Sequence, residues 1–436
     1  MEAQGGREMA EVQAVQRKPR AFPKVLSRAG AALWRNRELI AVVSIAYIVA
    51  LWSSHFRSTA FNNYVRLADA WRHGHIWIDW PGRWLDAALY NGKYYTVDAP
   101  FPAVLMFPLV LIRGDQANQT SVAIAVAALI VGLARQLLVK LGVARVPRLF
   151  LLLFLFAGTD VWWCAELGDV WFMAHLCAMA ATFAAFLELA GRRRGWVVGL
   201  LAIAAVFSRN TELFSAGFFA YALYTGDLAR VAAAARGETF VDTLDRRKAF
   251  RSFGAVLSLG FLAWIGYNEA SWGTVFDIGH TIYFHQDSWG EKDGSPFGLI
   301  YLPYQIYSFF LRAPVLVQWK QQAQWPILNV DNNGVALTFT SPALILAFFA
   351  RRPARLVTGL WIAAILVAAP DFLYYLNGWY QFGMRHALDF MPYLFVLMAL
   401  AAPKKMPAWA IGLCIYSALA GAWGVWWWNL VMRTGD

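Results

Sequence analysis

Runs of about twenty apolar residues, separated by short basic clusters, recur along this chain and constrain its fold more than any other feature. Of its 436 residues, 59% are hydrophobic and only 15% are charged, whereas a soluble domain carries roughly 25% charged residues. Runs of this length and composition cross a bilayer as helices. Strands of a membrane barrel would alternate apolar and polar residues, and these runs do not. The sequence therefore predicts an all-α polytopic membrane protein.

The basic clusters predict the side of the membrane that each connection faces, because Lys and Arg concentrate in cytoplasmic segments. Residues 1–38 contain eight Lys and Arg residues, which places the N-terminus in the cytoplasm. Alternation from there predicts about eleven spans and an external C-terminus. The expected spans are 39–54, 120–139, 149–163, 170–189, 196–208, 213–224, 253–267, 336–350, 356–375, 387–401 and 409–431.

The predicted domain organisation is a basic cytoplasmic tail, 1–38, followed by a single transmembrane domain, 39–436. Three long connections interrupt that domain: a first external loop at 55–119, a cytoplasmic loop at 226–252 and a second external loop at 269–335. Residues 64–71, 102–112 and 296–313 within the external loops are expected to form helices at the membrane surface.

The net charge of +11 would favour nucleic-acid binding in a soluble protein. Here most of the excess lies at the predicted cytoplasmic helix ends, so membrane topology explains it and no nucleic-acid partner is expected. The three cysteines, Cys164, Cys177 and Cys414, lie in or beside apolar runs without a CxxC motif. They are expected to be packing residues, with no zinc site or disulfide.

Aspartates in the first external loop are candidates for proton transfer. The loop contains Asp69, Asp79, Asp86 and Asp98. Charged groups at a membrane edge are costly and tend to be functional, and an aspartate within reach of an acceptor hydroxyl can remove its proton. The alternative is a surface helix at 64–71 whose charges simply face water.

A second candidate group lies in a tight turn between two predicted spans. It consists of Glu166 and Asp169, with His175 further along the following helix. Asp169 either caps that helix, or it joins Glu166 in orienting an acceptor or binding a divalent cation above His175. The spacing is too common to identify a metal.

Basic residues form a third group of candidates. Arg385 either pairs with Asp389 four residues later or binds a phosphate at the external edge; Gln381 lies in the same loop. Arg209, at the tip of a predicted hairpin, either anchors that hairpin among lipid headgroups or contacts an anionic lipid phosphate.

The second external loop carries a fourth, polar and aromatic group. Its members are Asp277, His280, Tyr283, His285, Asp287 and Trp289. Aromatic rings beside acids and amides suit stacking against a sugar. Tryptophan and tyrosine are also enriched at any membrane interface, so an ordinary interfacial role is the alternative.

The order and content of these segments resemble the GT-C superfamily of integral-membrane glycosyltransferases. The resemblance is strongest to the bacterial branch similar to protein O-mannosyltransferases and aminoarabinose lipid A transferases. Three sets of residues carry it: Tyr64 to Gly74 with Tyr90-Asn91-Gly92-Lys93-Tyr94-Tyr95 and Pro100-Phe101-Pro102; residues 166–171; and residues 375–392.

The resemblance implies inverting transfer of a sugar from a polyprenyl-phosphate donor to a lipid, glycan or protein acceptor at the external face of a bacterial inner membrane. It implies an aspartate base in the first loop, which is Asp69 or Asp98 here. It also implies that a basic side chain holds the lipid phosphate. The candidates for substrate binding in this chain are Lys93, Tyr94, Tyr95, Glu166, Asp169, His175, Arg209, His280, Gln381 and Arg385.

The chain departs from the family at one position that matters. The family's base usually precedes the tyrosine that Tyr64 resembles, and residues 58–63 contain no carboxylate. Either Asp69 or Asp98 has taken that role, or the activity is altered or lost. Two other functions therefore stay open: a transporter or flippase of a lipid-linked or polar substrate, and a non-catalytic GT-C-like subunit of glycan assembly.

Overall fold

The computed structural model describes residues 36–80, 85–287, 290, 294–316, 328–331, 333–378 and 381–429. Contacts divide the chain into two units, Met1–Ala41 and Val42–Asp436. Only residues 36–41 of the first unit are described, and they include the beginning of helix α2 (Arg37–Ser53). Everything described below belongs to the second unit.

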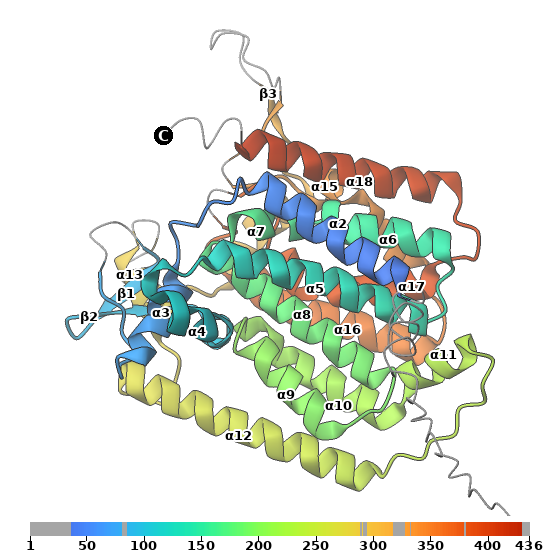
Figure 1. Cartoon of the computed structure of the whole chain (residues 1–436), viewed down its shortest axis with the longest axis horizontal. Helices are drawn as coiled ribbons and strands as arrows, with labels where there is room; N and C mark the ends of the chain where they lie inside the picture. The colour runs from blue at the N-terminus through green and yellow to red at the C-terminus, as the bar shows by residue number, and fades with distance from the viewer. Residues whose placement is uncertain are drawn as a thin grey trace, which may run out of the picture. The chain divides into compact units, whose positions relative to one another are not determined.

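Long apolar helices dominate the second unit, as the sequence predicted (Figure 1). Five of the described helices are long and apolar enough to cross a membrane: α5 (Gln119–Lys140), α8 (Val170–Leu189), α12 (Arg246–Trp272), α16 (Ala354–Leu373) and α18 (Ala408–Trp427). Helices α6 (Arg145–Ala157) and α7 (Val161–Leu167) make a sixth span if they are counted as one, bent by 43°. The helical class is confirmed, while the number eleven and the orientation stay predictions.

Two shorter apolar helices, α9 (Gly195–Val206) and α17 (Ala387–Ala401), pack with these spans. Helix α8 is central, since 83% of its most apolar window is buried, and it contacts α5, α9 and α17. Two of its alanines, Ala174 and Ala178, are fully buried. Small side chains let helix backbones approach closely, which is how packing is achieved where lipid removes the usual hydrophobic drive.

Two predicted spans are not single helices, and one predicted loop contains a helix. Residues 336–350 do not form one helix: α15 (Leu337–Thr340) is followed by the 3-10 helix η5 (Pro342–Phe349). Pro342 lies at this break, and proline both lacks an amide donor and clashes with the preceding turn. The predicted span at 149–163 is divided between α6 and α7, and the predicted cytoplasmic loop contains α11 (Asp227–Ala235).

The predicted first external loop, 55–119, is built around two helices and a β-hairpin. Helices α3 (Asn63–Arg72) and α4 (Phe101–Arg113) confirm the two expected helices, and the 3-10 helix η1 (Gly114–Gln116) follows. Strands β1 (Ala87–Tyr90) and β2 (Lys93–Thr96) pair antiparallel between them. The turn joins them through Asn91 and Gly92, whose φ angles of 49° and 74° suit a tight hairpin.

The second external loop docks against this hairpin. It contains α13 (Gly279–Gln286), η3 (Leu299–Tyr301), α14 (Leu302–Phe310), and the paired strands β3 (Val315–Leu316) and β4 (Leu328–Asn329). The side chain of Gln286 bonds both backbone groups of Leu89, at 2.9 and 2.7 Å. Figure 1 shows α3, α4, β1, β2 and α13 gathered at one end of the long helices.

The remaining described elements are the 3-10 helix η2 (Asn210–Phe214) and α10 (Ser215–Thr225), which complete the hairpin that begins with α9. The backbone amide of Phe101 donates to the carbonyl of Phe207, at 2.7 Å, and so joins the start of α4 to the end of α9. The loop elements are thereby fixed onto the helix ends that carry the polar residues described next.

Candidate active site

Buried polar side chains from four segments meet at the helix ends next to the first loop. Arg209 precedes η2, Asp371 lies in the last turn of α16, and Asp389 lies in the first turn of α17. His175 comes from α8 and His386 directly precedes α17. Charged groups inside a membrane protein are expensive and normally mark a functional path or site.

Asp389 is the centre of this cluster. Its side chain is completely buried, and Arg209 approaches one carboxylate oxygen with Nε at 3.0 Å. Thr211 donates to the same oxygen at 2.7 Å, and Nδ1 of His175 lies 2.5 Å from the other oxygen. A buried ion pair is tolerated when further hydrogen bonds satisfy the charge in this way.

A second carboxylate, Asp371, shares Arg209. Its Oδ1 lies 3.4 Å from Nη2 of Arg209 and 3.0 Å from Nδ1 of His386. Nδ1 of His386 is also 3.3 Å from Nη2 of Arg209, so it can either accept from Arg209 when unprotonated or donate to Asp371 when protonated. Arg209 is therefore held by two acids, and the network ties together η2, α8, α16 and α17.

Arg385 lies beside this network without joining it. Asp389, its expected partner within the helix, is occupied by Arg209 and His175. The guanidinium carbon of Arg385 lies 5.6 Å from the ring centre of Trp171 and 5.3 Å from that of Phe172. Its side chain forms no ion pair with any described carboxylate within 4.0 Å, and Nε and Nη1 have no hydrogen-bond partner among the described residues.

Arg385 is nevertheless buried, at 6% exposure, and charged. Burial lowers its pKa to about 10, which still leaves it protonated at neutral pH. Gly378 allows the loop to pass closely: its φ is +105°, and a Cβ there would lie 2.9 Å from Cζ of Arg385. A buried cation with free donors and no anionic partner is suited to binding an anion.

Asp98 is the carboxylate of the first loop that this arrangement favours. It follows β2, is 7% exposed, and its Oδ2 has no hydrogen-bond partner among the described residues. Burial, and then repulsion from Asp86, raise its pKa to about 7, while Arg209 and Arg385 act in the opposite direction. A general base works best when its pKa is near the working pH, and Asp98 meets that condition.

Asp86 connects Asp98 to the aromatic face that carries Arg385. Burial raises its pKa, and hydrogen bonds from Tyr283 and Trp171 oppose this effect. The Trp171 bond runs from Nε1 to Oδ2 of Asp86. Trp171 thus contacts Arg385 with its ring and Asp86 with its ring nitrogen.

The structure places Asp69 apart from these groups. Its side chain on α3 is 26% exposed and lies 3.7 Å from both Arg72 and His73. The hairpin residues also lie outside the buried cluster: Nζ of Lys93 is 3.4 Å above the ring of Trp77. In the same hairpin, Tyr94 stacks on Trp80 and Tyr95 packs against Trp272.

Glu166 and Asp169 have separate partners. Asn429 donates to Glu166 at 3.2 Å, and the hydroxyl of Thr59 donates to Asp169. The side chain of Asp169 forms no cap bond to α8, although the residue is at the N-cap position. Within the described part of the chain, no three His, Cys, Asp or Glu side chains are grouped to hold a metal ion.

Two other predicted residues have contacts of their own. His280 on α13 lies 6.1 Å, ring to ring, from Tyr374 and acts electrostatically on Asp86. Gln381 is fully buried and donates to the carbonyls of Asn377 and Asn333, at 2.7 and 3.1 Å, which fixes the loop before α17. Trp289, which the sequence grouped with His280, lies outside the described residues.

The sequence reasoning missed Asp371 and His386. A usable signal existed for Asp371, because it is a carboxylate inside an apolar run of span length, and such residues are candidates by default. His386 lies beside Arg385 in the predicted loop, and nothing in its spacing distinguishes it. Asp389 was noted only as a partner of Arg385, which it is not.

Comparison with known proteins leaves the family open. No protein-family model and no curated protein matches the sequence. The fold is similar to the Archaeoglobus fulgidus oligosaccharyltransferase in its apo form, with a TM-score of 0.46 and 16% identity over 89% of this chain and 55% of that one.

A second structure of the archaeal oligosaccharyltransferase AglB, in complex with an inhibitory peptide and a dolichol-phosphate, gives a TM-score of 0.46 at 15% identity, covering 90% of this chain and 55% of that one. The chain thus spans about half the length of the structures that it matches. At these identities and TM-scores the likeness does not establish a family.

Proposed function

We propose that this protein is a GT-C-type membrane glycosyltransferase that transfers a sugar from a polyprenyl-phosphate donor to a hydroxyl of a lipid, glycan or protein acceptor. One observation carries the proposal: Arg385, a buried cation without an anionic partner, lies within electrostatic range of Asp98, a buried carboxylate whose pKa is about 7. An anion site beside a base is what this reaction needs.

In the proposed reaction, Asp98 accepts the proton of the acceptor hydroxyl as its oxygen attacks the anomeric carbon of the donor sugar. The bond between that carbon and the phosphate oxygen breaks, and its electron pair leaves with the polyprenyl phosphate. A single displacement of this kind inverts the anomeric centre. Arg385 binds the phosphate and stabilises the charge that develops on it during departure.

Arg209 has a supporting role in this scheme. Both of its carboxylate partners lie within 3.4 Å, so its charge is already compensated by the protein. It adds to the positive potential at Asp98 and Arg385, since both of their pKa values respond to it. We therefore assign phosphate binding to Arg385 in preference to Arg209.

The proposal places the reaction at the external face of the membrane, because the first loop carries Asp98 and the positive-inside pattern assigns that loop to the outside. A bacterial inner membrane follows from the family resemblance. The apolar body of the bundle next to the cluster suits a donor whose long isoprenoid chain stays in the bilayer.

The test is a transfer assay with protein purified in detergent and a radiolabelled polyprenyl-phosphate sugar. The proposal is supported if label moves from the donor to an acceptor lipid or glycan and if this transfer is lost in the Arg385→Gln variant. Transport cannot occur in a micelle, so activity there separates a transferase from a flippase. Tight donor binding without transfer to any acceptor would favour the non-catalytic subunit.

A further inference from the structure

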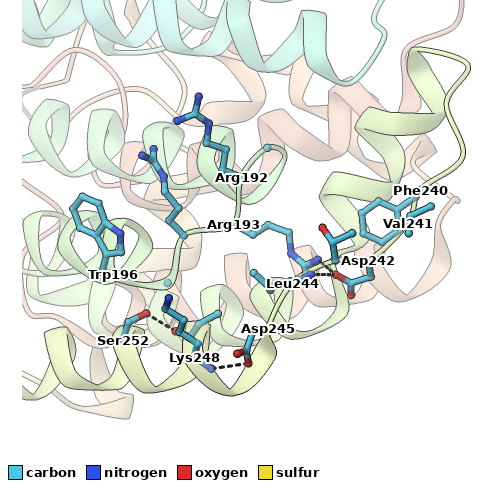
Figure 2. A pocket seen from close by; sticks show the side chains of 15 residues that line it. Arg192, Arg193, Trp196, Phe240, Val241, Asp242, Leu244, Asp245, Lys248 and Ser252 are labelled. Atoms are coloured by element: carbon cyan, nitrogen blue, oxygen red, sulfur yellow. Dashed lines mark hydrogen bonds and ion pairs between the residues drawn. The ribbon is translucent and has the colours of Figure 1, made fainter.

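A cavity of about 480 Å³ lies at the other end of α9 from Arg209. It is formed by the connection from α8 to α9, the segment 240–245 and the first turn of α12 (Figure 2). The charged residues that line it are Arg192, Arg193, Arg194, Asp242, Asp245 and Lys248. Helix α9 separates the cavity from the candidate active site by about 18 Å.

Two of the four cations are already used by the fold. Arg193 is buried, lies 2.7 Å from Asp242, and donates to the carbonyl of Leu223 at the end of α10. Figure 2 shows this Arg193–Asp242 contact beside the pocket. Arg194 binds both carboxylate oxygens of Glu188, at 3.0 and 2.9 Å.

The other two cations remain available. Arg192 and Lys248 are exposed at the cavity, and neither forms an ion pair with a described residue within 4.0 Å. Asp245, the acid nearest to Lys248 in sequence, accepts from the backbone amide of Lys248 as the cap of α12. The cavity therefore presents two cations from two different segments that form no ion pair with a described residue.

Helix dipoles add to this positive character. Helices α9 and α12 both begin at the cavity and run in the same direction, since Gly195 abuts Ala249 and Gly199 abuts Val256. The N-terminal end of a helix carries a partial positive charge and favours anions. Two such ends converge here because glycine at position 195 lets the two backbones touch.

The surroundings of the cavity are apolar and open. Trp196 at its rim is 50% exposed, and only 17% of the most apolar window of α12 is buried. Leu259 and Leu262 on α12 are each more than 60% exposed. Tryptophan beside cations is typical of a membrane interface. The exposed apolar face of α12 offers a surface for acyl chains.

We propose that this cavity binds the headgroup of an anionic phospholipid, with Arg192 and Lys248 contacting its phosphate and α12 its acyl chains. Basic pockets between spans bind such headgroups. The positive-inside pattern assigns the cavity to the cytoplasmic leaflet. The site does not depend on the transferase proposed above.

The test measures binding of short-chain phosphatidylglycerol, phosphatidylcholine and inorganic phosphate to the full-length protein in detergent. The double variant Arg192→Gln, Lys248→Gln is expected to bind phosphatidylglycerol roughly ten- to thirtyfold more weakly than the parent. The matched control is Lys404→Gln, Lys405→Gln, which removes two exposed charges from the same predicted side outside the cavity. It is expected to retain the parent affinity.

Three results would overturn the inference. Equal affinity for phosphatidylglycerol and phosphatidylcholine would show that charge does not select the ligand. Unchanged phosphatidylglycerol binding in the Arg192 and Lys248 double variant would show that these residues are not the site. Inorganic phosphate binding as tightly as phosphatidylglycerol would identify a soluble phosphate ligand in place of a lipid. Equal thermal unfolding of the variants checks that any loss is not a folding defect.

Discussion

Nε of Arg209 lies 3.0 Å from Oδ2 of Asp389, and this buried ion pair joins the turn between α9 and α10 to the first turn of α17. From the sequence, Arg209 either anchors a hairpin among lipid headgroups or contacts a lipid phosphate, and Arg385 either pairs with Asp389 or binds a phosphate. The fold pairs Arg209 with Asp389 and leaves Arg385 without an ion pair among the described residues.

Removing one member of this pair should destabilise the fold. The Asp389→Asn variant leaves Arg209 partly uncompensated inside the protein, and breaking a buried pair in this way costs about 3–5 kcal/mol. Thermal unfolding in detergent measures the effect. Arg236→Gln, which breaks the exposed pair with Glu238, is the control and should unfold like the parent. Equal unfolding of Asp389→Asn and the parent would contradict this reading of the cluster.

The pH dependence of transfer should reflect Asp98. The ionised carboxylate is the base, so activity is expected to rise with pH through about 7, where the pKa of Asp98 lies. Repulsion from Asp86 contributes to raising that pKa, so Asp86→Asn should lower it and move the rise in activity to lower pH. A pH–rate profile of both proteins checks this; a shift to higher pH in Asp86→Asn would contradict it.

The raised pKa of Asp98 also predicts how the stability of the fold changes with pH. The pKa of Asp98 in the folded protein, about 7, is above the ordinary aspartate value of 3.8. The folded state therefore binds the Asp98 proton more tightly than the unfolded state does. The stability that this proton contributes is lost as pH rises from about 4 to about 7. Asp98→Asn removes a buried charge, so at pH 8 this variant should unfold at the same temperature as the parent or a higher one. Unfolding at a clearly lower temperature would indicate a structural role for the carboxylate.

The hairpin that precedes Asp98 could have been predicted from the sequence. Asn91-Gly92, flanked by tyrosines on both sides, is a strong signal for a two-residue turn, and the structure has β1 and β2 there. The five long apolar helices and α3 were also predictable, the former from the length of their apolar runs and the latter from apolar periodicity. The pairing within the site was not, because Arg209, Asp371 and Asp389 are far apart in sequence and meet only through helix packing.

Substituting the turn glycine should disturb the loop. Gly92 has a φ of +74°, so Gly92→Ala places a Cβ in a left-handed conformation at a cost of about 1–2 kcal/mol. We expect faster cleavage of the first loop in limited proteolysis and lower transfer, because Asp98 follows the strand that this turn begins. Gly74→Ala, also at positive φ but at the end of α3, is the comparison variant. Equal proteolysis of Gly92→Ala and the parent would contradict a role of the turn in ordering the loop.

Donor affinity should depend on the guanidinium of Arg385. Losing a charge-assisted hydrogen bond costs about 1.5–3 kcal/mol, so Arg385→Gln should weaken donor binding about ten- to a hundredfold. Arg385→Lys keeps the charge but loses the planar contact with Trp171 and Phe172, and should give an intermediate value. Equilibrium binding of a polyprenyl phosphate to the parent and to each of the two variants measures these affinities. Full affinity in Arg385→Gln would remove this residue from the proposed site.

The central claim is that Asp98 is the base that replaces the carboxylate missing from residues 58–63. Its most direct test compares initial rates of sugar transfer by Asp98→Asn and Asp69→Asn, two substitutions of the same kind in the same loop. Loss of a general base costs about 10²–10⁴-fold in rate, and we predict that loss for Asp98→Asn, with Asp69→Asn close to the parent because Asp69 is partly exposed and apart from the cluster. Full activity of Asp98→Asn, or loss confined to Asp69→Asn, would contradict the account.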